Sequence, residues 1–542
     1  MVRPSTYCLS QLFTDVGSGS SLTICTDTLQ LCSMLKYHPL SLTLAASVIS
    51  NYPLTVADYA QEWLKRKLDA EIITADRALL HSFELSFEEL EHTSPLSAQL
   101  LMLFGFLDHR DMWYDLCLNA MDEDYPAWVR QVATRSRFQE FYAPLRNLSF
   151  VEGKPRGQGR GIVYEIHPAI HEFARWKAKE RGSEAEYIRC AVSLVAAKVP
   201  RSNDEDFLAI AQRLEPHADQ CKIYMEQDRM GAGLDLVELE KFGNLFRHLG
   251  RHDEASKLYQ GILSLLEEEE HPCPLDLELM AGIENNLGLV YHAQRNYGLA
   301  MQAYDRSIQK MLQNTMEDKG AAMVTIHNQG RTLMMLGRLD ESLQSLELAA
   351  GYFDRSTQED NEGIEQLLLE ERGRIYFRIL NDIGEIHLRM NNVEEAENSF
   401  RAAFDGLKQY LYPRHPAAFA VRLNLGRVCV EQHRFSTAKK IFEYIIETYL
   451  DWWGGRHSET MRAVAELADA HMRHGEMKRL MGDGGDVELE MAAQLWSEVL
   501  DFHQEVYGTG SDTAAMASSK LQRLRLLLSE ATSEDPYSMY CA

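Results

Sequence analysis

The stretch Asn285–Ile308, NNLGLVYHAQRNYGLAMQAYDRSI, predicts two short amphipathic helices joined by a turn. Gly288 is a small residue in the first helix, and Ala300, twelve residues later, is a small residue in the second. Small residues at a crossing let two antiparallel helices approach closely, and nearby bulky side chains such as Tyr304 fill the space beside them. The stretch therefore predicts a tightly packed helical hairpin.

The same template recurs along the C-terminal two thirds of the chain. The small residue of the first helix falls at Gly243, Gly288, Gly330, Gly384, Gly426 and Ala468. In the first five copies a second small residue follows twelve positions later, at Ala255, Ala300, Ser342, Ala396 and Ala438. A bulky residue follows four positions after that, at Tyr259, Tyr304, Leu346, Phe400 and Phe442. Helix pairs repeated in this way predict an all-α solenoid.

This spacing is the tetratricopeptide repeat (TPR) pattern, and its step of mostly 42 residues is longer than the usual one. The texts YPRHPAAFAVRLNLG, GGRHSETMRAVAELA and HPCPLDLELMAGIENNLG resemble kinesin-light-chain-type repeats. The resemblance implies a right-handed TPR α-solenoid of about six helix pairs over residues 235–510. A capping helix and a frayed tail are expected over residues 511–542.

Two copies depart from the regular step. Twelve extra residues fall within Asp354–Glu371, and in the last copy Ala492 takes the place of a small residue expected near position 480. Because an insertion within a packed helix would disturb stacking, we expect both insertions on loops. Glycines predict the turn inside three of the repeats, at Gly250, Gly337 and Gly475.

The N-terminal third has a different organisation. Residues 1–21 look loosely ordered, residues 22–70 predict short helices, and residues 183–234 predict two bridging helices. Within residues 71–182, helices are followed by NLSFVE, a glycine-rich run and IVYEIH, which predict two strands joined by a turn. Helices that end in a β-hairpin predict a winged-helix-like domain. The run Gly153–Gly161 lacks the spacing of a phosphate-binding loop and predicts the hairpin turn.

Three texts in this region resemble the NB-ARC module of NOD-like receptors. YHPLSLTLAASVI resembles its GLPL region, LSFEELEHTSPLSAQLLMLFGFLDH the start of its winged helix in fungal receptors with TPR tails, and EIHPAIHEFAR its MHD region. The resemblance implies that Pro39 lies near the adenine and His167 near the phosphates of bound ADP, as a vestigial nucleotide site. The alternative for His167 is a histidine that caps the hairpin or packs in the core.

Three functions remain open. Pro168 stands where the MHD aspartate would be, and no Walker A lysine or acidic Walker B strand precedes this region, so the positioning and charge neutralisation needed for hydrolysis are missing. We therefore expect a non-catalytic interaction scaffold without a cofactor, a truncated relative of NOD-like receptors. One alternative is the C-terminal part of a STAND-type ATPase whose P-loop half is missing from this chain. Another is a cargo-type TPR adaptor, which would carry a heptad-rich coiled coil before the repeats.

Composition limits the location and partners. The chain lacks eighteen uninterrupted apolar residues, and its nine cysteines form no CxxC pair, which favours reduced thiols and a cytoplasmic location without membrane contact. The net charge of −26 falls mostly after residue 200 and disfavours nucleic acid as a partner. A protein or peptide partner of basic character is electrostatically easier to bind, and the alternative is a solvated acidic surface that aids solubility. The oligomeric state stays open.

The predicted peptide groove uses residues of the first helices. Asn286, Asn328 and Asn424 lie two positions before the small residue, whereas Asn244, Arg331 and Arg427 lie one position after it. Asparagine can donate to and accept from a peptide backbone, and arginine can bind a carboxylate. The alternative is that the asparagines bond within the repeats and define their register. His415 and His457 belong to the repeat text, so we expect no metal site.

Overall fold

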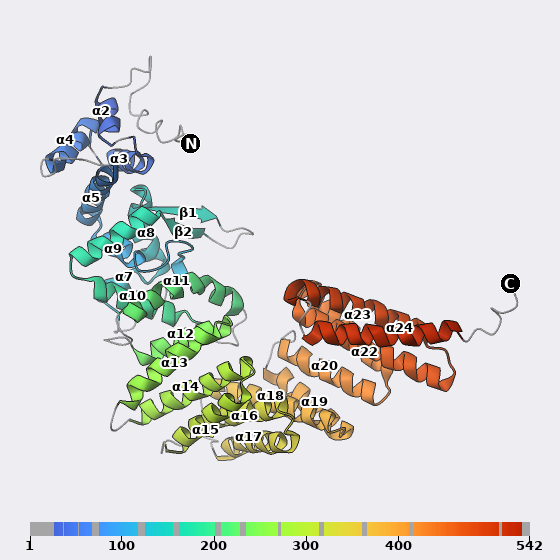
Figure 1. The fold of residues 1–542 in the computed structure, drawn as a ribbon. Coiled ribbons are helices and arrows are strands. Elements are labelled where there is room, and N and C mark those ends of the chain that lie inside the picture. The colour runs from blue at the N-terminus through green and yellow to red at the C-terminus, as the bar shows by residue number, and fades with distance from the viewer. Residues whose placement is uncertain are drawn as a thin grey trace, which may run out of the picture. The chain divides into compact units, whose positions relative to one another are not determined.

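A computed structural model describes residues 26–35, 37–52, 54–67, 75–117, 125–155, 162–200, 207–227, 235–268, 273–313, 319–359, 366–410, 416–508 and 512–533. The chain divides into two compact units, unit 1 at Met1–Glu270 and unit 2 at His271–Ala542. Nearly all described elements are α-helices, and a two-stranded sheet lies in unit 1 (Figure 1). The prediction of a predominantly helical fold with a small hairpin is therefore confirmed.

Unit 1 is an irregular assembly of helices around one hairpin. Its elements are α2 (Thr26–Met34), α3 (Pro39–Asn51), α4 (Val56–Lys67), α5 (Ala75–Thr93), α6 (Pro95–Phe104), η1 (Tyr114–Leu116), α7 (Ala127–Val132), α8 (Arg135–Asn147), β1 (Val151–Pro155), β2 (Ile162–Ile166), α9 (Pro168–Glu180), α10 (Glu184–Ala197), α11 (Phe207–Gln227), α12 (Leu236–His248) and α13 (His252–Glu267). The apolar helix α6 lies at the centre, with α5, α8, α9 and α10 packed against it. Its side chains from Leu100 to Phe104 are almost fully buried, because the helix is apolar on every side.

The hairpin pairs β1 with β2 antiparallel, from Val151 opposite Ile166 to Pro155 opposite Ile162. Most of the predicted glycine-rich turn, residues 156–161, lies outside the described residues. Met112 adds a third short piece, because its N–H and C=O both bond the backbone of Tyr164. The prediction of two strands here is confirmed.

Two buried histidines hold the loop that carries Met112. His171 on α9 lies 2.7 Å through Nε2 from the carbonyl oxygen of Leu107. His217 on α11 accepts through Nδ1 from the N–H of Asp108 and contacts the carbonyl of Asp111 through Nε2. Burial lowers the pKa of both imidazoles, that of His171 to about 4. The loop is therefore fixed by neutral histidines from two helices.

Unit 2 is a row of antiparallel helix pairs (Figure 1). Its helices are α14 (Pro274–Ala293), α15 (Tyr297–Gln313), α16 (Lys319–Met335), α17 (Leu339–Glu359), α18 (Gln366–Arg389), α19 (Val393–Tyr410), α20 (Pro416–Glu431), α21 (Phe435–Trp453), α22 (Ser458–Met481), α23 (Asp486–Tyr507) and α24 (Asp512–Ser533). Each helix packs mainly on the next one in sequence, as stacked repeats do.

The predicted small and bulky residues form the contact inside each pair. A Cβ added to Gly288 would lie 2.3 Å from a ring carbon of Tyr304, so only glycine fits there. Gly243, Gly330, Gly384 and Gly426 face the bulky residue sixteen positions later in the same way. All five bulky residues are fully buried. The repeated template is thus the packing contact that defines each pair.

A left-handed backbone residue lies seven positions after each of the first five small residues. Gly250 and Gly337 have φ of +77° and +75°, as predicted for turn glycines, and Arg295, Asn391 and His433 take the same place in the other pairs. The prediction for Gly475 is wrong, because this residue lies inside α22, where a Cβ would come within 2.9 Å of the carbonyl oxygen of Gly485. The turn comes later, at Gly482 (φ +77°).

The expectation that both insertions lie on loops is also wrong. In the segment Asp354–Glu371, α17 continues to Glu359 and α18 begins at Gln366, so described residues on both sides are helical. In the last pair α22 is 24 residues long and continues to Met481. Longer helices keep the i to i−4 hydrogen bonds and extend the packed surface, so stacking survives the insertions.

Candidate functional site

The candidate site is the first-helix face, the surface of unit 2 formed by α14, α16, α18, α20, α22 and α24. The first helices α14, α16, α18 and α20 each contact the first helix of the following pair, and α22 contacts α24 through the ion pair of Asp469 with Lys520. Among the described residues, the second helices contact one another less. Side chains from neighbouring repeats therefore meet on the first-helix face, which suits it to hold an extended ligand.

The asparagines on this face bond to the neighbouring repeat. The Nδ2 of Asn328 donates to Oδ1 of Asn285 at 2.9 Å, and that of Asn424 donates to Oδ1 of Asn381 at 3.0 Å. In the repeat between them, His327 contacts Asp382 at 2.8 Å in the equivalent places. Residues three and two positions before the small residue thus join α14 to α16, α16 to α18, and α18 to α20. These contacts match the alternative that asparagines define the register of the repeats.

The other two predicted asparagines lie in different units. Asn244 lies on α12 in unit 1, where its Oδ1 accepts from the hydroxyl of Tyr259 at 2.8 Å. Asn286 is partly buried on α14. All the predicted groove residues except Asn244 therefore lie on first helices of unit 2.

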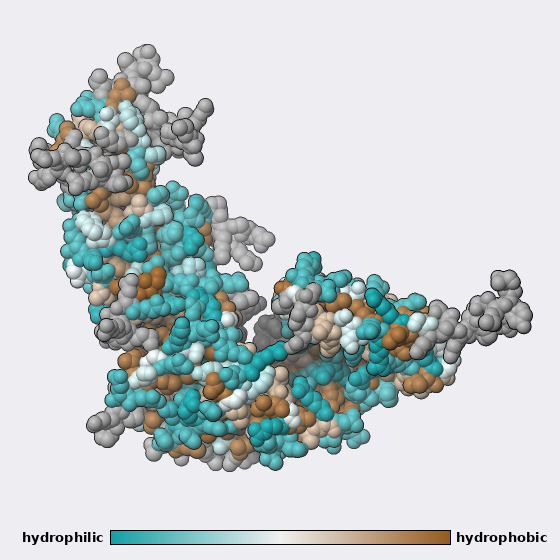
Figure 2. Space-filling view, viewed as in Figure 1, coloured by the Kyte–Doolittle hydropathy of each residue, from teal (hydrophilic) through white to brown (hydrophobic). Residues whose placement is uncertain are grey.

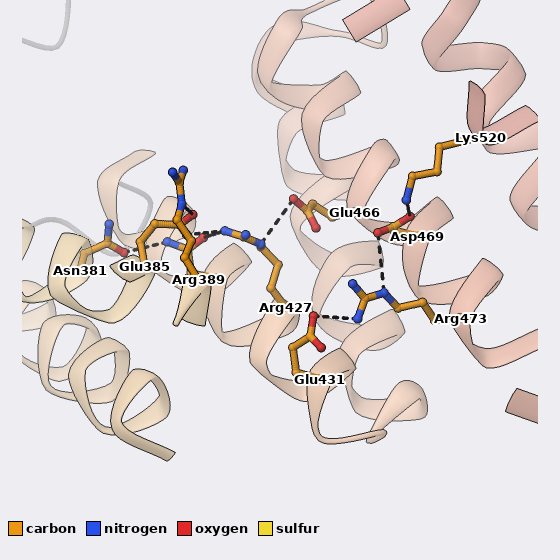
Figure 3. Close-up of polar contacts among 10 residues, drawn as sticks. Asn381, Glu385, Arg389, Arg427, Glu431, Glu466, Asp469, Arg473 and Lys520 are labelled. Carbon is orange, nitrogen blue, oxygen red and sulfur yellow. Dashed lines mark hydrogen bonds and ion pairs between the residues drawn. The ribbon is translucent and has the colours of Figure 1, made fainter. Parts of the chain in front are cut away.

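A column of alternating charge runs along this face, one position after each small residue: Arg331, Glu385, Arg427 and Asp469. Arg427 lies in the middle (Figure 3), where its guanidinium contacts Glu385 at 2.5 Å and Glu466 at 3.7 Å. It thereby links α18, α20 and α22. Burial raises the pKa of the Glu466 carboxyl, and the charge of Arg427 opposes that shift.

A second column lies one helical turn further along, with the signs reversed: Arg389, Glu431 and Arg473. Arg389 pairs with Glu385, and Arg473 lies 2.7 Å from Glu431 and 3.9 Å from Asp469 (Figure 3). Lys520 on α24 closes the run by contacting Asp469 at 2.6 Å. From α18 to α24, each charge of these two columns therefore has an opposite charge beside it.

The part of the first-helix face formed by α16 and α18 has a different balance of charges. Arg331 lies 3.6 Å from Asp382, a carboxylate that His327 already contacts, and the Arg331 side chain is 41% exposed. Arg378, one turn before Asp382 on α18, is within electrostatic reach of both Arg331 and Asp382. Burial and the nearby Arg331 also lower the pKa of His292. Two guanidinium groups thus share one carboxylate here, which leaves local positive charge.

The predicted nucleotide residues both lie at helix N-termini in unit 1. Pro39 is the first residue of α3, and His167 is the N-cap of α9, with its Nδ1 accepting from the N–H of Ala169 at 3.2 Å. His457 caps α22 in the same way through the N–H of Glu459. A cap accounts for His167 without a nucleotide, and its role in nucleotide binding stays a prediction.

Sequence reasoning missed Asn285, Asn381, Arg378 and Glu466 as members of the face. The signal was present, because Asn285 and Asn381 occupy the same place three positions before the small residue. Glu466 likewise lies two positions before Ala468, as Asn328 does before Gly330, whereas Arg378 lies outside these repeat positions. Among the described helices, none is long and apolar enough to cross a membrane.

Comparisons with known proteins identify one kind of repeat in part of this chain. No curated protein matches the chain. A structure of kinesin-light-chain-type TPR-like repeats from Podosopora anserina is 14% identical with a TM-score of 0.32, covering 44% of this chain and 99% of that chain. A STAND signal-transduction ATPase with a TPR sensor from Pyrococcus horikoshii is 13% identical with a TM-score of 0.44, covering 95% and 71%. A Rap protein complexed with competence and sporulation factor is 13% identical with a TM-score of 0.38, covering 66% and 97%. The tetratricopeptide repeat family model matches residues 376–451, so the helix pairs there are tetratricopeptide repeats.

Proposed function

We propose that this protein is a non-catalytic interaction scaffold that binds an extended segment of a partner protein along the first-helix face of unit 2. The observation that carries the proposal is the contrast between Arg331 and Arg427. Arg427 is held by Glu385 and Glu466, whereas Arg331 and Arg378 share Asp382 with His327. An acidic side chain or terminal carboxylate of the partner binds at Arg331 and Arg378, because a guanidinium pairs well with a carboxylate.

The interlocked asparagines have a supporting role in this proposal. Asn328 and Asn424 bond to the preceding repeat, so they stiffen the face before a ligand arrives. A preformed face loses less conformational entropy on binding than a mobile one. Sequence-specific recognition then depends on the few charges that the array leaves without a full partner.

Selection from a phage-displayed library of random peptides, with the purified full chain as bait, tests the proposal. We expect acidic peptides to be enriched and Arg331→Glu with Arg378→Glu to weaken their binding by about tenfold or more. The control is Arg389→Glu, which lies on the paired part of the face. Enrichment of basic peptides, or equal loss in the control, would place the ligand elsewhere. Circular dichroism should be the same for all variants.

Unit 1 supports a regulatory role related to NOD-like receptors, as part of the same proposal. Its helices precede a hairpin that a third short segment extends, which is the arrangement expected of a winged helix. The purified protein should not hydrolyse ATP above background. Measurable turnover that His167→Ala abolishes would instead support the STAND-type ATPase alternative.

A further inference from the structure

The last helix pair of unit 2 ends in an apolar surface that the first-helix face does not use. We name it the insertion tip: the end of α22 from Leu480, the turn at residues 482–485, and the start of α23 to Met491. Leu480, Met481, Val487 and Met491 are 89%, 63%, 73% and 42% exposed. Brown apolar surface is visible among teal beside the C-terminal end of α24 in Figure 2. Four large apolar side chains exposed together usually mark an interaction surface.

The insertion tip is a firmly packed structure. Arg479 pairs with Asp486 across the turn and donates to the carbonyl of Leu527 on α24 at 2.6 Å, while Lys478 pairs with Glu488 at 2.5 Å. Beneath the turn, Gly475 lies against Leu489, where any larger residue would collide. Since α22 is tied to both α23 and α24, the exposed apolar groups do not result from a loosely packed end. The twelve-residue insertion therefore builds a preformed surface.

The geometry of the tip points to a helix as its ligand. Val487 and Met491 lie one turn apart at the start of α23, and Leu480 and Met481 are the last two residues of α22, which packs on α23. A surface of this kind fits the apolar stripe of an amphipathic helix, whose contacts recur every three to four residues. Methionine suits such a role because its flexible, polarisable side chain adapts to different partners.

Charge indicates the kind of helix. Asp483 and Glu490 flank the apolar residues, and both are exposed. Neither forms an ion pair within the part of the chain that the structure describes. A partner helix with lysines or arginines beside its apolar stripe would pair with them. A second copy of this chain is disfavoured, because the net charge of −26 makes two copies repel each other.

We infer that the insertion tip is a docking site for a basic amphipathic helix of another protein. The inference is independent of the first-helix face, because it uses none of its residues.

Fluorescence anisotropy with the full chain and a designed leucine–lysine amphipathic peptide of about 18 residues tests the inference. We expect saturable binding, and a loss of about tenfold or more in Leu480→Asp with Val487→Asp. The matched control is Leu312→Asp, since Leu312 on α15 is 78% exposed but lies outside the tip. Circular dichroism verifies that each variant is folded.

Four results would overturn the inference. These are no binding at about 100 μM peptide, equal binding of a leucine–glutamate peptide of the same pattern, an equal loss in the Leu312→Asp control, and a concentration-dependent dimer that the tip variants abolish. The last result would assign the surface to a second copy. Arg331→Glu with Arg378→Glu should leave peptide binding at the tip unchanged, so failure here and failure of the proposed function are distinguishable.

Discussion

In unit 2 the same contact recurs inside successive helix pairs, whereas in unit 1 the helices that precede α12 are held by contacts that occur once. The contact of Gly288 with Tyr304 and the contact of Gly426 with Phe442 have the same geometry and the same spacing in sequence. His171 on Leu107 and His217 between Asp108 and Asp111 have no counterpart elsewhere in unit 1 among the described residues. The difference teaches that a fold built from repeated contacts can be predicted from its sequence. A fold held by single contacts of buried histidines has a stability that depends on pH.

The largest expected effect tests the recurring contact. Gly288→Ala places a Cβ into the ring of Tyr304, so we expect the free energy of unfolding of unit 2 to fall by about 2–3 kcal/mol. Gly282 is the control in the same helix, because a Cβ there would meet open space. Gly282→Ala should stabilise by about 0.5–1 kcal/mol through helix propensity. Urea denaturation measures both, and equal effects would mean that close approach does not define the pair.

The second prediction tests the single contacts of unit 1. The pKa of His171 is lowered to about 4, below the unfolded value of about 6.5, so its contribution is complete above pH 6.5 and is lost as pH falls toward 4. Between pH 7 and pH 5 we expect unit 1 to lose about 2 kcal/mol from His171. The lowered pKa of His217 adds a loss of the same sign. Hydrogen exchange of the α9 amides follows this change, and His171→Gln should flatten it.

The third prediction compares two arginines at one repeat position. Arg427→Ala leaves Glu385 and Glu466 without their shared partner, and we expect a loss of about 1–2 kcal/mol. Arg331→Ala should cost less than about 0.5 kcal/mol, since solvent screens its single long contact. Partner binding should show the opposite order. If Arg331→Ala were the more destabilising variant in denaturation, the division between structural and binding arginines would be wrong.

The Arg427→Ala variant should also depend on pH. The pKa of Glu466 is already raised by burial, and removal of Arg427 raises it further. A group with a raised pKa stabilises at low pH and loses that contribution as pH rises through its folded pKa. The deficit of the variant should therefore be smaller at pH 5 than at pH 7. A deficit independent of pH would show that lost packing, and not the unpaired charge of Glu466, causes it.

The smallest expected effect comes from replacing a residue of one repeat by the residue that the other repeats have at that position. Ser342 stands where four other pairs have alanine, and its hydroxyl donates to the carbonyl of Gly330 at 2.6 Å. Ser342→Ala removes this bond but leaves a carbonyl that the helix also uses, so we expect a loss of less than about 1 kcal/mol. Thermal unfolding measures it. A larger loss would show that the repeats are individually adjusted.

The repeated packing contacts could be predicted from the sequence. The side-chain contacts between residues that are distant in the chain could not. The helix pairs, their small and bulky residues and two turn glycines follow from spacing alone, because they use local contacts. Gly475 has the turn spacing but lies in α22, since the surrounding insertion lengthens the helix. The groove residues lie on first helices, as the spacing predicted, and their role in binding stays a prediction. Spacing could not show that Arg427 meets acids of two other repeats while Arg331 shares one.

The alternating column on the first-helix face has a consequence for assembly. Arg331, Glu385, Arg427 and Asp469 occupy one repeat position with alternating sign. If a helix pair stacked on the next but one, Arg331 would face Arg427 and Glu385 would face Asp469. Repeat proteins are prone to such misassembly, because neighbouring units offer nearly the same apolar surface. Because like charges would then face each other, the alternating charges destabilise an arrangement in which one repeat is skipped. The column therefore favours stacking of the repeats in their sequence order.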